Sequence, residues 1–61
     1  MKRNALIKHL RKHGCSLVRE GGRHSWWGNL TLGTRSSVPR HGETKDILAQ
    51  KICKDLNIPK I

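Results

Sequence analysis

The stretch GGRHSWW, residues 21–27, decides how this 61-residue chain folds. Two adjacent glycines can adopt the positive φ angles that a two-residue hairpin turn requires, and the tryptophan pair favours a strand. The stretch therefore predicts a β-hairpin whose second strand begins at His24. We expect Arg19 and Arg23 close to this histidine, so that a titratable imidazole would lie among guanidinium groups. Such a place suits an anionic ligand.

A three-stranded pattern extends from this hairpin. Residues 15–20 and 24–27 are predicted to be its two strands, because both are short, β-compatible and separated by the glycine turn. Residues 28–34 predict a second turn, and residues 35–38 predict a short edge strand after it. Pro39 closes that strand, since proline cannot donate a hydrogen bond to a central ladder.

The second strand is expected to present different side chains on its two faces. Because successive side chains of a strand point in opposite directions, His24 and Trp26 share one face while Ser25 and Trp27 share the other. One tryptophan is expected in the core. The pattern leaves open which one, and the exposed ring would be either a packing lid or a stacking surface for a base.

The first helix is predicted at residues 2–13. Leu6, Ile7 and Leu10 form its apolar side, while its basic residues point elsewhere. Gly14 is expected to end the helix, because glycine accommodates the left-handed conformation that commonly follows a helix C-terminus.

The second helix is predicted at residues 44–56. Thr44 can cap its amide end, with Asp46 in the first turn, and Asn57 and Pro59 would terminate it. Its apolar side is predicted to consist of Ile47, Leu48, Ile52, Cys53 and Leu56.

These elements predict an α+β fold in the order helix, strand, strand, strand, helix, as a single domain over residues 1–61. Both helices have an apolar face to cover, so we expect them on one face of a three-stranded antiparallel sheet, with the other face left available. A chain of this length removes only about 60% of its extended surface on folding. The core is therefore expected to be thin, and a binding partner could add to the working stability.

The charge of the chain indicates an anionic partner. Thirteen Lys and Arg residues against four Asp and Glu residues give a net charge of +9. Such an excess favours nucleic acid or an acidic protein as the partner, and the alternative is a basic surface that only keeps the chain soluble.

Several other function classes lack their sequence signals. Cys15 and Cys53 fall where buried apolar residues would fit, and no Cys and His spacing matches a zinc site, so neither a metal nor another cofactor is expected. No apolar run would span a bilayer, and the first residues lack a signal-peptide core. We therefore expect a cytoplasmic protein with no membrane partner.

RNA cleavage fits the residues around the turn. The 2′-hydroxyl of RNA can attack the adjacent phosphodiester when one group takes its proton, and His24 is the candidate catalytic residue for that transfer. Arg19 and Arg23 could hold the phosphate. The other candidate nucleic-acid-binding residues are Lys8, Lys12 and Arg40, and the secondary candidates at the site are His41, Ser25 and Trp26. The plainer interpretation of His24 is an ordinary surface residue.

The order of these features resembles the HicA family of toxins, also called YcfA-like. The resemblance rests on a basic helix ending at Gly14, the Gly-Arg-His sequence at 22–24, and the Val-Pro-Arg-His sequence at 38–41 before a terminal helix. It implies a fold like that of double-stranded-RNA-binding domains, mRNA interferase activity through His24, and inhibition by a HicB-type antitoxin. Arg23 stands where the family has serine.

Three functions follow from these observations. The first is the toxin of a type II toxin–antitoxin system, a metal-independent endoribonuclease that cleaves mRNA with a single catalytic histidine. The second is a non-catalytic RNA-binding module of the same fold. The third is a small subunit that binds an acidic protein.

Overall fold

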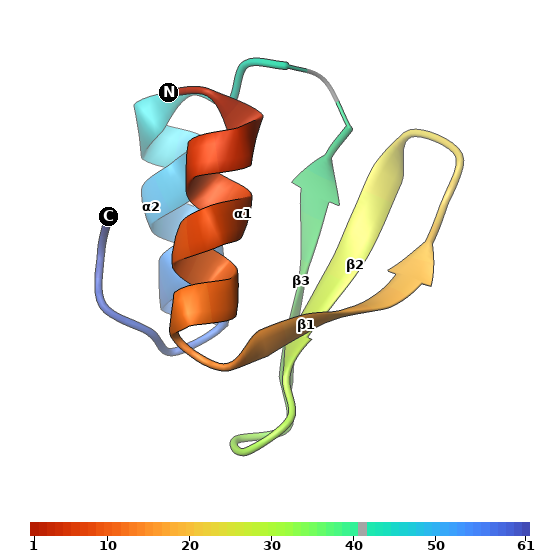
Figure 1. Cartoon of the computed structure of the whole chain (residues 1–61), viewed down its shortest axis with the longest axis vertical. Coiled ribbons are helices and arrows are strands. Elements are labelled where there is room, and N and C mark those ends of the chain that lie inside the picture. Colours follow the sequence, from red (N-terminus) through yellow and green to blue (C-terminus); the bar gives the residue numbers. More distant parts are fainter. Residues whose placement is uncertain (41) are drawn as a thin grey trace.

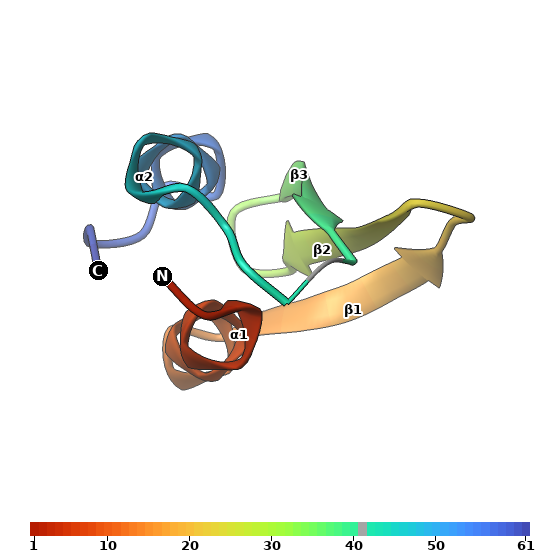
Figure 2. The same cartoon turned by 90° about the horizontal axis from the view of Figure 1, so that it is seen from above.

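The structure is a computed structural model that describes residues 1–40 and 42–61. Its elements in chain order are α1 (Arg3–Lys12), β1 (Cys15–Glu20), β2 (His24–Asn29), β3 (Thr34–Pro39) and α2 (Asp46–Asp55). The strands form one antiparallel sheet in the order β1-β2-β3. Both helices lie on the same face of that sheet (Figures 1 and 2). The predicted α+β architecture is confirmed.

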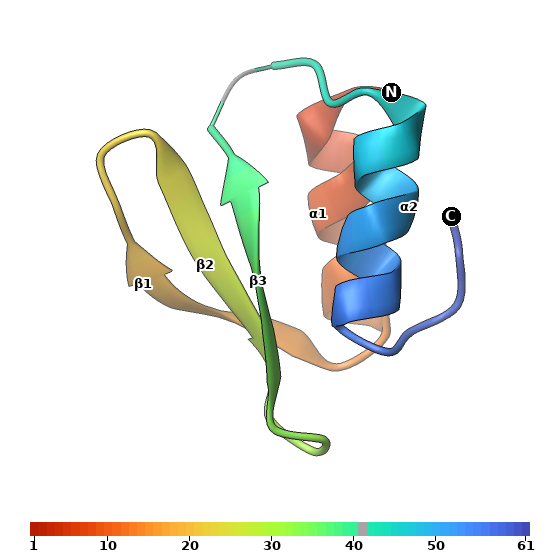
Figure 3. The same cartoon turned by 180° about the vertical axis from the view of Figure 1, so that it is seen from behind.

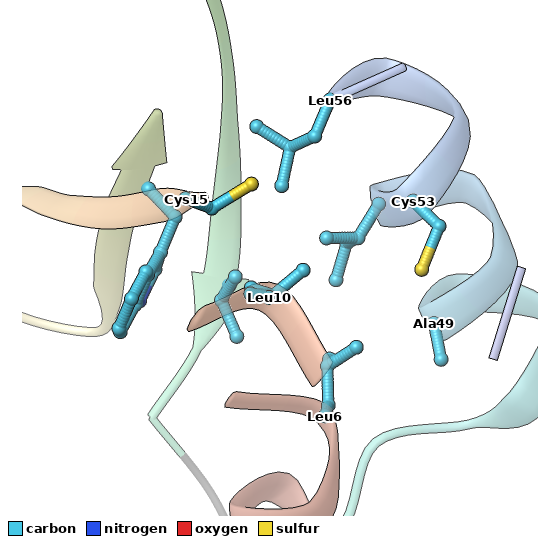
Figure 4. Close-up of a cluster of buried hydrophobic side chains, with 9 residues drawn as sticks. Leu6, Leu10, Cys15, Ala49, Cys53 and Leu56 are labelled. Carbon is cyan, nitrogen blue, oxygen red and sulfur yellow. The ribbon is translucent and has the colours of Figure 1, made fainter. Parts of the chain in front are cut away.

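The covered face of the sheet and the two helices enclose the core. α1 contacts β1, and α2 contacts β3. Figure 3 shows from behind that both helices lie on the same side of the sheet. Trp27 is 3% exposed and is the core tryptophan, while Trp26 on the other face is 44% exposed. The buried apolar set comprises Leu6, Leu10, Cys15, Trp27, Val38, Ala49, Ile52, Cys53 and Leu56, most of them labelled in Figure 4.

Both helices end as their sequences predict. Gly14 follows α1 with φ +82°, the left-handed conformation expected there. Asn57 follows α2 with φ 56°, and the amides of Asn57 and Ile58 bind the carbonyls of Lys54 and Cys53 at 3.0 Å each. This is the Schellman pattern, which satisfies carbonyl groups left open at a helix end.

The second strand is longer than its sequence suggests. Gly28 and Asn29 were expected in a turn, but both are buried strand residues that pair with β1 and β3. The Asn29 side chain donates to the carbonyl of Leu56 at 3.2 Å, and Thr34 donates to the same carbonyl at 3.1 Å. These contacts tie the end of α2 to the sheet, so tertiary structure overrides the turn preference of asparagine.

The start of α2 also differs from the prediction. The helix begins at Asp46 with Lys45 at the N-cap position and no side-chain cap. Thr44 is 2% exposed, and its backbone amide binds the Met1 carbonyl at 2.8 Å, so it joins the start of the chain instead of capping α2. Ile47, predicted on the apolar side, is 84% exposed, and Ala49 takes a core position.

The turn between β1 and β2 uses glycine for a different reason from the one predicted. Among the glycines that the structure describes, Gly14 and Gly33 are the two with positive φ angles. The prediction of positive φ angles at Gly21 and Gly22 is therefore wrong. A Cβ on Gly21 would lie 2.9 Å from the carbonyl oxygen of His24, whereas a Cβ on Gly22 would meet nothing within 4 Å. Gly21 is therefore required for a close backbone approach.

Replacing Gly21 by alanine is expected to destabilise the domain by about 1 to 3 kcal/mol, because the new methyl group collides with backbone that cannot move aside. Gly22→Ala is the matched control and should leave stability unchanged or raise it by up to about 1 kcal/mol. Urea unfolding followed by circular dichroism measures both. Equal midpoints for the two variants would contradict this account of the turn.

The two cysteines are free and buried. Burial raises the pKa of both Cys15 and Cys53 above the ordinary value of 9.0. Because the thiolate is the reactive form, iodoacetamide at neutral pH is expected to label the native protein at least about 100-fold more slowly than the unfolded chain. Rapid labelling of the native protein would show that the thiols are accessible.

The same shift predicts how stability depends on alkaline pH. Because the thiol pKa is higher in the folded state than in the unfolded state, the contribution of the buried thiols to stability is fully present below pH 9. That contribution is lost as the pH rises through the pKa of the folded state. The unfolding midpoint should therefore fall above pH 9, and substitution of both cysteines by alanine should weaken that fall.

Candidate functional site

His24 begins β2 on the face of the sheet that the helices leave uncovered. It is exposed, and its neighbours across the sheet are the turn residue Gly21 on one side and Pro39 at the end of β3 on the other. The Gly21 amide donates to the His24 carbonyl at 2.8 Å, which closes the hairpin directly at the histidine. The ring can therefore be approached from solvent while its backbone is fixed.

An irregularity in β1 brings Arg19 to the same face. The register shifts between Leu17, opposite Trp27, and Arg19, opposite Trp26, so Val18 is an extra residue in β1. Strict alternation would place Arg19 on the covered face with Leu17, but the bulge turns it to the open face. Arg19 is then a diagonal neighbour of His24, about 7 to 8 Å away.

The open face also carries an apolar patch. Trp26 is 44% exposed and Val18 is 42% exposed. Gly28 lies next to them, and a Cβ there would come within 2.8 Å of a Val18 methyl group, so Val18 leans over the glycine. An indole thus lies next to His24 on the open face, and an isopropyl group lies further along the same strand pair, over Gly28.

A polar network lies on the covered side of this turn. The bulge that exposes Arg19 directs Glu20 toward Ser25, its partner in the register, and the fully buried Ser25 hydroxyl donates to the Glu20 carboxylate at 2.7 Å. Arg3 of α1 donates to the same hydroxyl at 3.1 Å and to the Pro39 carbonyl at 2.8 Å. Ser25 therefore links α1 to the β1–β2 hairpin, on the face of the sheet opposite to His24.

Arg40 binds the turn itself. Its Nε lies 3.3 Å from a Glu20 carboxylate oxygen, and its Nη1 donates to the carbonyls of Gly21 at 3.2 Å and Gly22 at 3.5 Å. Its backbone amide donates to the Arg23 carbonyl at 3.1 Å. The residue that leaves β3 thus holds each residue of the turn before His24.

Other basic residues lie elsewhere. Lys8 and Lys12 are exposed on α1, the helix that covers the opposite face of the sheet, so they are not brought together with His24. His9 and His13 pack ring to ring at 4.5 Å, and His9 binds the Pro59 carbonyl at 2.7 Å. The candidate His41 lies outside the described residues.

Two residues of the site were not predicted from the sequence. Arg3 and Glu20 hold the Ser25 hydroxyl from two directions, and neither was assigned a role. Part of a signal was present, because Ser25 was predicted to share a face with Trp27, which the structure shows to be the core tryptophan, and a buried hydroxyl requires partners.

The site is an open face and not a hollow. Within residues 1–40 and 42–61 the structure contains no pocket and no cluster of three or more residues of the kinds that bind metals. No helix in those residues is long and apolar enough to cross a bilayer. An exposed imidazole with an arginine on the neighbouring strand of the same face can transfer protons beside a bound phosphate, and an open face suits an extended ligand.

Comparison with known proteins gives one match. A family model described as "HicA toxin of bacterial toxin-antitoxin" matches residues 3–58, which include every element of the fold. No curated protein and no solved structure matches the chain.

Proposed function

The chain belongs to the HicA toxin family of bacterial toxin–antitoxin systems, and from this membership we propose that it is an endoribonuclease that cleaves mRNA without a metal ion. The observation that carries the proposal is the position of His24, exposed on the uncovered face with Arg19 on the neighbouring strand. The proposed reaction takes place in the cytoplasm.

His24 acts as the proton-transfer group. It removes the proton from a ribose 2′-hydroxyl, whose oxygen attacks the adjacent phosphorus while the bond to the 5′-oxygen of the next nucleotide breaks. The leaving oxygen takes up a proton from solvent water, and the products end in a 2′,3′-cyclic phosphate and a 5′-hydroxyl. Histidine suits this step because its ordinary pKa of about 6.5 lies near neutral pH.

The basic residues bind and stabilise the phosphate. Arg19 lies across the hairpin from His24, on β1, and Arg23 directly precedes His24 in the chain. A guanidinium at either place offsets the charge that develops on the phosphoryl oxygens. Lys8 and Lys12 on α1 attract RNA from a distance through the field of a chain with net charge +9.

The partner is an antitoxin of the HicB type. It inhibits the toxin by covering the open sheet face and placing acidic groups against Arg19 and Arg23, which would exclude RNA from His24. Such a contact would also bury the exposed Trp26 and Val18.

The experiment is cleavage of a defined RNA by the purified chain in excess EDTA. We expect products with 5′-hydroxyl and cyclic-phosphate ends, and no cleavage where a single 2′-deoxynucleotide replaces the ribose at the cut position. Cleavage that requires added divalent metal, or that persists at the deoxy position, would reject the mechanism.

A non-catalytic RNA-binding module is the second candidate, favoured by the exposed Trp26 beside basic residues. It predicts binding without any product. Its affinity should fall with salt, with a slope of about 0.7 in log affinity per log salt for each phosphate neutralised on a single strand.

A further inference from the structure

Trp26 exposes an indole that the core does not require. Trp26 is 44% exposed, whereas Trp27 on the other face is 3% exposed and already fills the core. Trp26 follows His24 by two residues on the same face, a separation of about 7 Å along the strand. A ligand that extends from the imidazole along β2 therefore lies over this indole.

The strand residues around Trp26 carry positive charge. Its partners across the sheet are Arg19 and Ser37, and Arg35 lies one pair further along on the same face. Glu20 is the single acidic residue of the three strands, and it is directed to the opposite side by its contact with Ser25. The face thus offers a flat aromatic surface in a basic setting.

We propose that Trp26 stacks on an unpaired base next to the phosphodiester presented to His24, so that the site accepts single-stranded RNA and rejects duplex. This proposal rests on the proposed function. A base inside a duplex is already stacked on its neighbours, whereas a base in a single strand is free to stack on an aromatic side chain near positive charge.

The binding test uses a fluorescent RNA that carries a 2′-deoxynucleotide at the cut position, so that affinity is measured without cleavage. Trp26→Ala is expected to weaken binding about 5- to 150-fold, the loss that corresponds to 1 to 3 kcal/mol for one stacked base. Trp26→Phe should retain most of the affinity. Ile47→Ala is the matched control, since it removes an 84% exposed side chain from α2 and should change nothing.

A change in the RNA makes the test independent of protein folding. An abasic nucleotide next to the cut position should weaken binding of the native protein as much as Trp26→Ala does, and should have little further effect on that variant. Equal cleavage of duplex and single strands, or native affinity in Trp26→Ala, would overturn the stacking role. Loss of antitoxin binding alone in Trp26→Ala would make the patch a protein-binding site. If the native protein gives no product, the proposed function fails separately.

A second inference rests on the hydrogen bonds of Arg40. This side chain contacts the Gly21 carbonyl and Glu20, and its backbone amide contacts Arg23. We infer that Arg40 and Glu20 are positioning residues that fix the turn before His24, and that the Arg40 guanidinium is not a phosphate contact. This second inference also rests on the proposed nuclease activity.

Kinetic constants distinguish a positioning role of Arg40 from a role as a phosphate contact. Arg40→Ala is expected to lower kcat about 10- to 100-fold, the order of loss that follows a misplaced reacting group, with KM and salt dependence unchanged. Arg40→Lys should resemble Arg40→Ala, because an ammonium keeps the charge but not the forked contacts. Arg35→Ala, on the open face of β3, should instead raise KM.

Amide hydrogen exchange tests the positioning role without a cleavage assay. The Gly21 amide, which binds the His24 carbonyl at 2.8 Å, should exchange its hydrogen faster in Arg40→Ala and in Glu20→Gln than in the native protein. Unchanged exchange, or full rescue of cleavage by Arg40→Lys, would overturn the positioning role.

Discussion

Replacing His24 by alanine is expected to lower kcat for RNA cleavage by about 10²- to 10⁴-fold, the contribution typical of one positioned acid or base. The side chain is exposed on the open face and forms no part of the buried core, so the variant should fold normally. Affinity for RNA should fall little, because the guanidinium groups remain. The measurement is single-turnover cleavage in EDTA, with affinity taken from a non-cleavable RNA.

The control for this variant is His13→Ala. It removes the same chemical group from just after α1, behind the covered face of the sheet, and should leave the cleavage rate unchanged. Full nuclease activity in His24→Ala would reject the assignment.

Local signals in the sequence account for most of the fold. Gly14 and Asn57 mark the helix ends because left-handed residues follow directly from residue type. The first strand, Cys15–Glu20, was predicted at its observed bounds, and alternation correctly separated the faces of Trp26 and Trp27. These features depend on few neighbours, so a single sequence is sufficient to predict them.

Contacts between distant segments account for the errors. Asn29 is a turn former by type, but a carbonyl at the end of α2 holds it within β2. Ile47 was predicted on the apolar side of α2, but the buried side of the helix consists of Ala49, Ile52 and Cys53, which leaves Ile47 84% exposed. No property of these residues taken alone reveals which partner reaches them.

The same limit applies to the site. His24 could be identified as a candidate because it follows a glycine turn, but the bulge at Val18 that puts Arg19 on its face has no signal in the residue types of β1. Arg3 and Arg40 reach the hairpin from α1 and from beyond β3. Their roles depend on the closed fold, and sequence reasoning therefore assigned Arg40 by its charge and left Arg3 without a role.

Replacing Leu10 by alanine is expected to destabilise the domain by about 2 to 5 kcal/mol, through lost apolar burial and the cavity that remains. Leu10 of α1 is fully buried in the core cluster, where Figure 4 labels it. A domain of this length buries too little surface to lie far above the lower limit of about 5 kcal/mol for native stability. A large fraction of the variant should therefore be unfolded at 37 °C.

Ile47→Ala is the matched control for the core, because it shortens an apolar side chain of α2 that is 84% exposed and should change stability by less than about 0.5 kcal/mol. Urea unfolding followed by circular dichroism compares the two variants. A partner that binds the folded toxin should restore the folded population of Leu10→Ala at concentrations well above its Kd, since binding to the native state alone shifts the unfolding equilibrium. An unchanged midpoint for Leu10→Ala would mean that the helices do not depend on this contact for their position over the sheet.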